Sequence, residues 1–196
     1  MTIVVAVEHK DGVLVACDSQ VTDSGTSFLM HRSQKKIGTV GPYIIGAAGR
    51  LRTGQVLLNS DGLPTPPQRA SDEALNKFMI TKFAAAAQNT LKDAGVEQVV
   101  DHERLLTESE LIVCVQGRAY MVGEDYAIMR AGDSTSIASG IAITGSGYPF
   151  ALGAYHAMSK ATRKMSAKDI ATTMVEAAIK WDQGCGGEIE FYEQSR

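Results

Sequence analysis

Residues 2–19 read TIVVAVEHKDGVLVACDS, and this stretch decides the class of fold. Two β-branched apolar runs, 2–8 and 13–17, flank the turn residues Lys10, Asp11 and Gly12. Two such runs around a short polar turn predict a β-hairpin. Because the first run begins at Thr2, we expect the start of the chain to be held inside a sheet.

Beyond the hairpin, strands and helices follow one another in blocks. Apolar runs predict strands at 28–31, 35–40, 42–49, 110–116, 119–123, 141–145 and 188–193. Helical spacing of apolar residues predicts helices at 51–58, from Ser71 to about Gly95, at 149–161 and at 167–183, the last opened by a near capping box. Blocks of this kind are typical of an α+β fold rather than of alternating βαβ units.

The composition predicts one globular domain over residues 1–196. The chain has 44% apolar and 21% charged residues and a net charge of -3, and its Lys and Arg residues are scattered, which disfavours nucleic-acid partners. Its three cysteines, Cys17, Cys114 and Cys185, lack CxxC spacing, which argues against a disulfide framework or a zinc site and favours a reducing compartment. We see neither a signal peptide nor a membrane span, and we therefore expect a cytoplasmic protein. We also expect neither a metal nor a cofactor.

Four features stand out as candidates for chemistry: Thr2, Asp18 after the second apolar run, the pair Lys35-Lys36, and the glycine clusters at 46–49 and 145–147. Each has an ordinary structural explanation when it is taken alone. The aspartate can cap a turn, the lysines can protect an edge strand, and the glycines can form turns. The second cluster also lacks the lysine of a phosphate-binding P-loop.

Together these features resemble the proteasome β-subunit and HslV-type threonine peptidases. The opening hairpin with Asp18, the segment FLMHRSQKKI (28–37), GAAG (46–49), TGSGYPFALGAYH (144–156) and KWDQGCGGEIEFY (180–192) are similar to motifs of that family, whereas residues 60–110 match only in helical character. The resemblance implies a four-layer αββα sandwich of the N-terminal-nucleophile hydrolase type. It also implies hydrolysis of peptide bonds.

The resemblance assigns roles to seven residues in the catalytic apparatus. Thr2 would be the nucleophile, Lys36 the cation beside it and Asp18 the carboxylate that orients the lysine, while the N–H of Gly46 would face the oxyanion. Ser146 and Asp182 would position the Thr2 amine, and Cys185 stands where most members have serine. A free α-amine with a pKa near 8 can serve as the base for its own hydroxyl.

The resemblance also implies a substrate groove. Val21, Thr22, Ile44 and Ala48 take the positions that line it and, being small or apolar, predict cleavage after apolar residues. Basic residues in the stretch from Arg50 to Arg52 would change that preference, unless they are simply the exposed face of a helix start.

Catalysis requires that Met1 be removed, because only then is the Thr2 amine free. Threonine in second position favours this excision. The family implies homo-oligomeric stacked rings, a polypeptide substrate and a separate ATP-dependent unfoldase, since this chain has no ATP-binding motif. Two alternatives remain open at this point: a catalytically silent ring scaffold of the same fold, and an amidohydrolase that acts on a small amide.

Overall fold

The hairpin predicted at the start of the chain forms the middle of a four-stranded antiparallel sheet. In the computed structural model, β1 (Val4–His9) and β2 (Gly12–Asp18) pair in register from Val4 with Cys17 to His9 with Gly12. The outer strands of this sheet are β12 (Gly140–Thr144) beside β1 and β13 (Ile189–Ser195) beside β2. Every residue of β2 is buried, so the start of the chain is held between the layers of the molecule.

The structure describes residues 2–23, 26–31, 34–100, 103–106, 108–132, 140–159 and 165–196. Met1 lies outside these ranges, as do the last two residues of the helix expected at 149–161. None of the helices within these ranges is long and apolar enough to cross a membrane.

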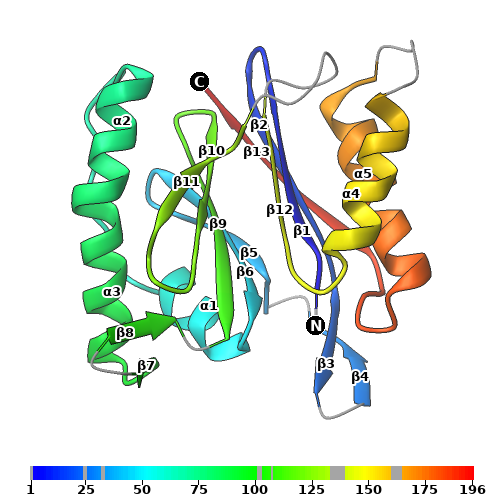
Figure 1. The fold of residues 1–196 in the computed structure, drawn as a ribbon, viewed down its shortest axis with the longest axis horizontal. Coiled ribbons are helices and arrows are strands. Elements are labelled where there is room, and N and C mark those ends of the chain that lie inside the picture. Colours follow the sequence, from blue (N-terminus) through cyan, green and yellow to red (C-terminus); the bar gives the residue numbers. More distant parts are fainter. Residues whose placement is uncertain are drawn as a thin grey trace.

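A second antiparallel sheet of five strands lies against the first. Its order is β11-β10-β9-β6-β5, and its strands are β5 (Ile37–Val40), β6 (Tyr43–Gly49), β9 (Ser109–Val115), β10 (Arg118–Val122) and β11 (Ile128–Arg130). Two hairpins lie outside both sheets: β3 (Gln20–Asp23) with β4 (Thr26–Leu29), and β7 (Glu97–Val100) with β8 (Glu103–Leu106). Figure 1 shows the β3–β4 hairpin extending from the end of the molecule where the chain starts.

Helices cover the outer face of each sheet, which gives four layers in the order α, β, β, α (Figure 1). The five-stranded sheet is covered by α1 (Leu51–Leu58), α2 (Asp72–Phe78), the π-helical stretch η1 (Met79–Phe83) and α3 (Ala84–Asp93). The four-stranded sheet is covered by α4 (Tyr148–Ser159) and α5 (Ala167–Trp181). The predicted α+β sandwich is thereby confirmed.

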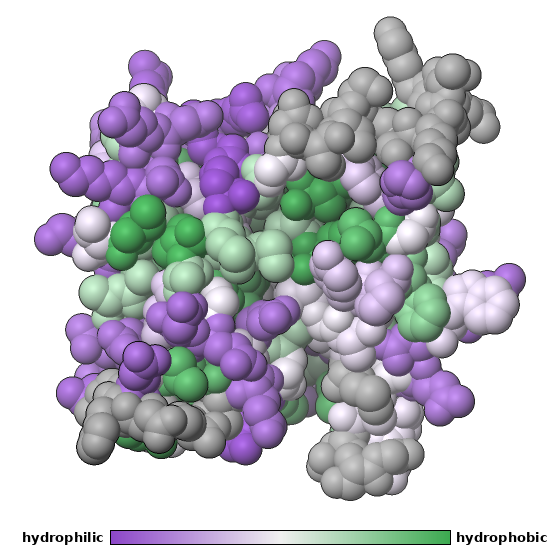
Figure 2. All heavy atoms as spheres, viewed as in Figure 1, coloured by the Kyte–Doolittle hydropathy of each residue, from purple (hydrophilic) through white to green (hydrophobic). Residues whose placement is uncertain are grey.

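Three apolar clusters hold these layers together, one at each interface. The first lies between the five-stranded sheet and the helices α1, α2, η1 and α3, and the second lies between the four-stranded sheet and the helices α4 and α5. The third fills the space between the two sheets. On the face shown in Figure 2, apolar residues form a band across the middle, and hydrophilic residues surround it. Burial of the side chains in the three clusters is the main favourable contribution to folding.

The helix starts follow the capping residues seen in the sequence. Ser71 accepts a hydrogen bond from the amide of Ala74, and Ser166 with Asp169 forms a complete capping box at the start of α5. The sequence did not indicate the hairpin β7–β8, the short strand β11 or the π-helical turn. In each of these, the local pattern is too short or too irregular to separate a strand or a wide helical turn from its surroundings.

Candidate active site

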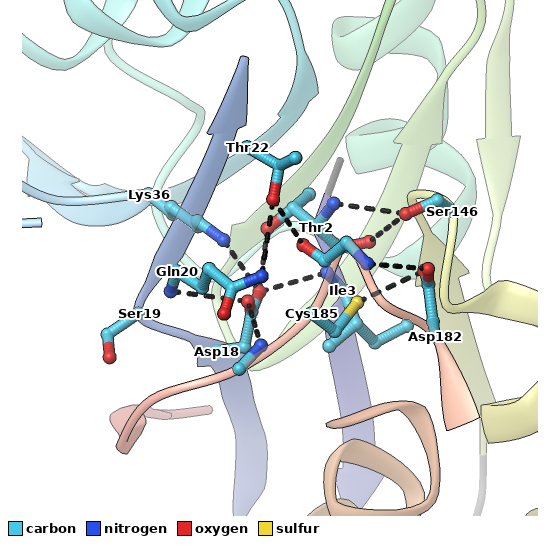
Figure 3. A network of polar contacts seen from close by, with 12 residues as sticks. Thr2, Ile3, Asp18, Ser19, Gln20, Thr22, Lys36, Ser146, Asp182 and Cys185 are labelled. Carbon is cyan, nitrogen blue, oxygen red and sulfur yellow. Dashed lines mark hydrogen bonds and ion pairs between the residues drawn. The ribbon is translucent and has the colours of Figure 1, made fainter. Parts of the chain in front are cut away.

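Thr2 lies at the end of the sandwich, directly before β1, where several polar groups converge (Figure 3). Its hydroxyl donates to Asp18 Oδ1 at 2.7 Å, and its backbone N–H donates to Ser146 Oγ at 3.2 Å. The amide of Gly147 donates to the Thr2 carbonyl at 3.2 Å. Thr2 is only 4% exposed. The second residue of the chain is thus fixed on three sides rather than free to move.

Asp18 is the centre of this network. It ends β2, is fully buried, and receives the Lys36 ammonium at 2.7 Å on the same Oδ1 that accepts from Thr2. The amides of Ile3 and Gly186 add bonds of 3.0 Å each, one to each carboxylate oxygen. A buried carboxylate requires this number of donors, because burial without them is costly. Asp18 therefore links the Thr2 hydroxyl to the Lys36 ammonium through one oxygen atom.

Lys36 reaches this carboxylate from the start of β5. Its side chain is 5% exposed and has its ion-pair partner in Asp18. Lys35, the neighbouring residue, points elsewhere, and its ammonium lies 5.2 Å from the centre of the Tyr192 ring. The structure therefore separates the two lysines that the sequence placed side by side, and only Lys36 enters the network.

Ser146 also belongs to a second group of polar residues, which is centred on Asp182. Asp182, just after α5, accepts from the amide of Gly184 at 2.9 Å and from the Cys185 thiol at 3.3 Å. Burial alone would raise the pKa of Asp182, but hydrogen bonds from Ser146, Gly184 and Cys185 outweigh it and hold this pKa below its ordinary value. Burial, with the nearby Asp18 and Asp182, raises the pKa of the Cys185 thiol. Cys185 is thus a neutral donor rather than a nucleophile.

The loop that carries Ser146 owes its shape to a glycine. Gly145 has a φ of +102°, and a Cβ atom there would lie 2.2 Å from the Thr2 carbonyl oxygen. Only glycine adopts this backbone and permits so close an approach. The GSG cluster noted in the sequence is therefore a turn that packs against the first residues of the chain.

Gly46 does not lie where the resemblance implied. It sits in the middle of β6 and is paired with strands on both sides. The amide of Ala47 donates to the carbonyl of Lys36, and successive amides of a strand point to opposite edges, so the N–H of Gly46 faces β9 inside the sheet. Two cavities on the surface have Thr2 in their walls. Gly49 lines both of these cavities, and Gly46 lines neither. The geometry therefore favours Gly49 over Gly46 as a backbone donor beside Thr2.

A cavity of about 730 Å³ opens beside Thr2. The β3–β4 hairpin supplies Val21, Thr22 and Phe28 to its wall, and β6 contributes Ala47 and Gly49. The structure thus places Val21 and Thr22 on the cavity wall, and a role for them in binding substrate stays a prediction.

The two other expected groove residues lie elsewhere. Ala48 lines a smaller hollow of about 340 Å³, which it shares with Thr2 and Ser146. The expectation for Ile44 is wrong, because its side chain is buried in the apolar cluster between the two sheets.

Several residues at the site were not assigned roles from the sequence. Gly186 and Gln20 donate backbone bonds to Asp18, and Glu108 joins Arg50 and Arg52 on the cavity wall. Residue type does not reveal which backbone amides act as donors, and Glu108 lies within the segment 60–110, which has no family motif. Within the described part of the chain, no three His, Cys, Asp or Glu side chains gather closely enough to hold a metal ion.

Known proteins resemble this chain in sequence and in fold. No protein-family model matches the chain. The ATP-dependent protease subunit HslV of Pediococcus pentosaceus is 26% identical over 179 residues, which cover 90% of this chain and 85% of that protein.

Solved structures extend the comparison to the fold. Thiobacillus denitrificans BPH in complex with epoxomicin superposes with a TM-score of 0.75, 19% identity and 98% coverage of both chains. Eukaryotic HslV from Trypanosoma brucei gives a TM-score of 0.66, 18% identity and 99% coverage of both. At these identities the superpositions establish the fold. The resemblance inferred from the motifs is confirmed: the chain is related to the proteasome β-subunit and HslV-type peptidases and has their N-terminal-nucleophile hydrolase fold.

Proposed function

We propose that the protein is a threonine-type endopeptidase subunit in which Thr2 becomes the nucleophile when Met1 is removed. The observation that carries this proposal is the sharing of Asp18 Oδ1 by the Thr2 hydroxyl and the Lys36 ammonium, each at 2.7 Å. A threonine whose only role was to begin a strand would need neither a buried lysine nor a buried carboxylate beside it. The similarity to an ATP-dependent protease subunit supports the same reaction class.

The first step is attack of the Thr2 hydroxyl on the peptide carbonyl. The freed α-amine takes the hydroxyl proton, because a cation nearby lowers the pKa of an amine and keeps it neutral. Lys36 is that cation, and its charge also stabilises the developing alkoxide. Asp18 keeps the lysine oriented through their 2.7 Å contact.

The amine is held in place by the second group of polar residues. The Thr2 nitrogen already lies 3.2 Å from Ser146 Oγ, and Ser146 is in turn bonded to Asp182. After attack, the protonated amine gives its proton to the leaving amine of the substrate, and an ester links the acyl group to Thr2. Water, activated by the same amine, then hydrolyses the ester and restores the hydroxyl.

The oxyanion formed during attack requires backbone donors. We assign this role to the N–H of Gly49, which by the alternation along β6 falls on the edge that faces the cavity. One such donor is worth about 3 kcal/mol of barrier in other acyl-transfer enzymes.

The assembly is part of the proposal. The HslV relative is named as a subunit of an ATP-dependent protease. By analogy with it, we propose that the chain forms homo-oligomeric stacked rings that receive polypeptides from a separate unfoldase. The expected compartment is the cytoplasm.

Intact-mass spectrometry with a peptide-boronate or epoxyketone probe tests the proposal. We expect a mass that lacks Met1 and gains one probe, and no gain in Thr2→Ala. A Met1-free protein that takes up no probe and cleaves no fluorogenic peptide would instead indicate a silent scaffold. Cleavage of small amides without cleavage of peptides would indicate an amidohydrolase. Either result contradicts the peptidase proposal.

A further inference from the structure

The wall of the cavity beside Thr2 carries more basic than acidic side chains, although the sequence predicted an apolar groove. Its wall carries four basic side chains, Lys35, Lys36, Arg50 and Arg52, against a single carboxylate, that of Glu108. Two of the four basic groups, Lys36 and Arg50, form an ion pair with a carboxylate.

The two lysines are engaged by the protein itself. Lys36 is bound to Asp18 at 2.7 Å, where it serves the nucleophile. Lys35 lies over the ring of Tyr192, at 5.2 Å from the ring centre. The charge of Lys36 is therefore balanced by a carboxylate, whereas the exposed Lys35 keeps its positive charge but is held over the Tyr192 ring.

The two arginines differ from each other. Arg50 Nε lies 3.5 Å from Glu108 Oε2, so its charge is largely balanced. Arg52, at the start of α1, makes no ion pair with any residue in the part of the chain that the structure describes. Of the two basic residues of the cavity wall that have no carboxylate partner in the described part of the chain, Arg52 is the one that is not held over an aromatic ring.

The rest of the wall increases the effect of this charge. Val21, Phe28, Ala47 and Leu51 are apolar and lie on the same cavity. Apolar walls displace water, and the attraction between opposite charges grows as the local dielectric constant falls. A carboxylate that enters the cavity would be attracted to Arg52, whereas a basic side chain would be repelled by it.

We infer that the site prefers peptides with an acidic side chain, Glu or Asp, on the acyl side of the scissile bond, and that Arg52 is the residue that determines this specificity. The inference rests on the proposed function, since it concerns the substrate of the Thr2 site. It replaces the apolar preference expected from Val21, Thr22, Ile44 and Ala48, of which Ile44 and Ala48 do not line the cavity.

Three fluorogenic peptides that differ only in the residue before the scissile bond, as Glu, Leu or Arg, test this inference with the Met1-free protein. We expect kcat/KM to rank Glu above Leu above Arg, with a Glu-to-Leu ratio of roughly two to five, as for a charge pair partly screened by solvent. Arg52→Glu reverses the order of the Glu and Arg peptides. Added salt raises KM for the Glu peptide only, because screening weakens the charge attraction.

Two matched variants separate a local effect from a general change in charge. Glu108→Gln releases Arg50 and should increase the Glu-to-Leu ratio above that of the wild type. Arg69→Glu, an equal charge reversal on a different hollow of about 560 Å³, should leave the ranking unchanged.

The outcomes are distinguishable from those of the peptidase test. If the Leu peptide is cleaved fastest and Arg52→Glu does not alter the ranking, the specificity inference is overturned while the peptidase proposal stands. If none of the three peptides is cleaved and no probe adduct forms, the peptidase proposal fails, and this inference fails with it.

Discussion

Lys36 and Asp18 form a buried ion pair in which each charge depends on the other. Lys36→Ala leaves the Asp18 carboxylate buried without its cation, and such a loss costs about 3–5 kcal/mol of stability. It also removes the cation that stabilises the alkoxide, so we expect peptide cleavage to fall by at least about 100-fold. Urea denaturation and peptide kinetics on the same preparation measure both effects.

Lys35→Ala is the matched control for this change. Lys35 is the adjacent residue, but its ammonium lies against the Tyr192 ring and not against Asp18. We expect this variant to keep the stability of the wild type within about 0.5 kcal/mol, as for most surface substitutions. Equal effects of the two substitutions would contradict the assignment of Lys36 to the network.

Asp182 makes part of the stability dependent on pH. Its pKa in the folded protein lies below the ordinary value, because hydrogen bonds from Ser146, Gly184 and Cys185 outweigh the effect of burial. The unfolded chain therefore takes up this proton at higher pH than the folded protein. The stabilisation is present above the ordinary pKa of about 3.9 and is lost as pH falls through the folded-state pKa.

Asp182→Asn tests this dependence. The difference in free energy of unfolding between wild type and variant should be constant above about pH 5 and shrink below about pH 4. Urea denaturation at a series of pH values measures it. A difference that persists unchanged to pH 2 would show that the carboxylate is not stabilised in its ionised form.

The sequence located side chains at the site better than it located backbone groups. Thr2, Asp18, Lys36, Ser146, Asp182 and Cys185 were each named from motifs, and the structure brings all six together. Gly46 and Ile44 were misplaced because a motif does not reveal which edge of β6 an amide faces or which side of the sheet a residue faces. A shift of one residue reverses both.

At the scale of elements, the turn between β12 and α4 fixes Thr2 through Gly145. Gly145→Ala places a Cβ atom against the Thr2 carbonyl and forces an alanine into a positive φ, a backbone strain of about 1–3 kcal/mol. We expect it to lower the thermal midpoint and to abolish most cleavage, because Thr2 must move.

Gly153→Ala is the control from the adjoining helix α4. A Cβ atom at Gly153 meets open space, and alanine favours a helix over glycine by about 1 kcal/mol. This variant should be as stable as the wild type or more so and should keep its activity. If both alanine variants behave alike in scanning calorimetry and cleavage, Gly145 has no special role.

Elements with a strong pattern were predicted, and those whose form depends on neighbours were not. The helix at 51–58 was predicted with the bounds of α1, and the capping residues Ser71 and Ser166 marked true helix starts. β11, of three residues, pairs with β10 at the end of its sheet, so its strand conformation comes from the sheet rather than from its own sequence. The π-helical turn likewise has no periodicity of its own that sequence could reveal.

At the scale of the whole molecule, the fold leaves parts of its surface uncovered. β5 and β11 end one sheet, and β13 ends the other opposite β12, whose outer edge is bridged by Gly132 at Ile141. Open strand edges invite pairing unless another chain or element covers them. Large apolar side chains are also exposed on α4, at Tyr148, Phe150 and Leu152. Both features are compatible with the ring assembly proposed from the related peptidases.

The proposed ring predicts the mass of the protein in solution. A chain of 20.9 kDa should elute as a closed homo-oligomer whose mass, from size-exclusion chromatography with light scattering, is a whole-number multiple of that value and changes little on dilution. Closed symmetry satisfies every interface at once and so gives a discrete mass rather than a distribution. Thr2→Ala should form an oligomer with the same number of subunits, since it removes only the nucleophile. A monomer at all concentrations, with peptide cleavage intact, would show that the Thr2 site functions without the ring.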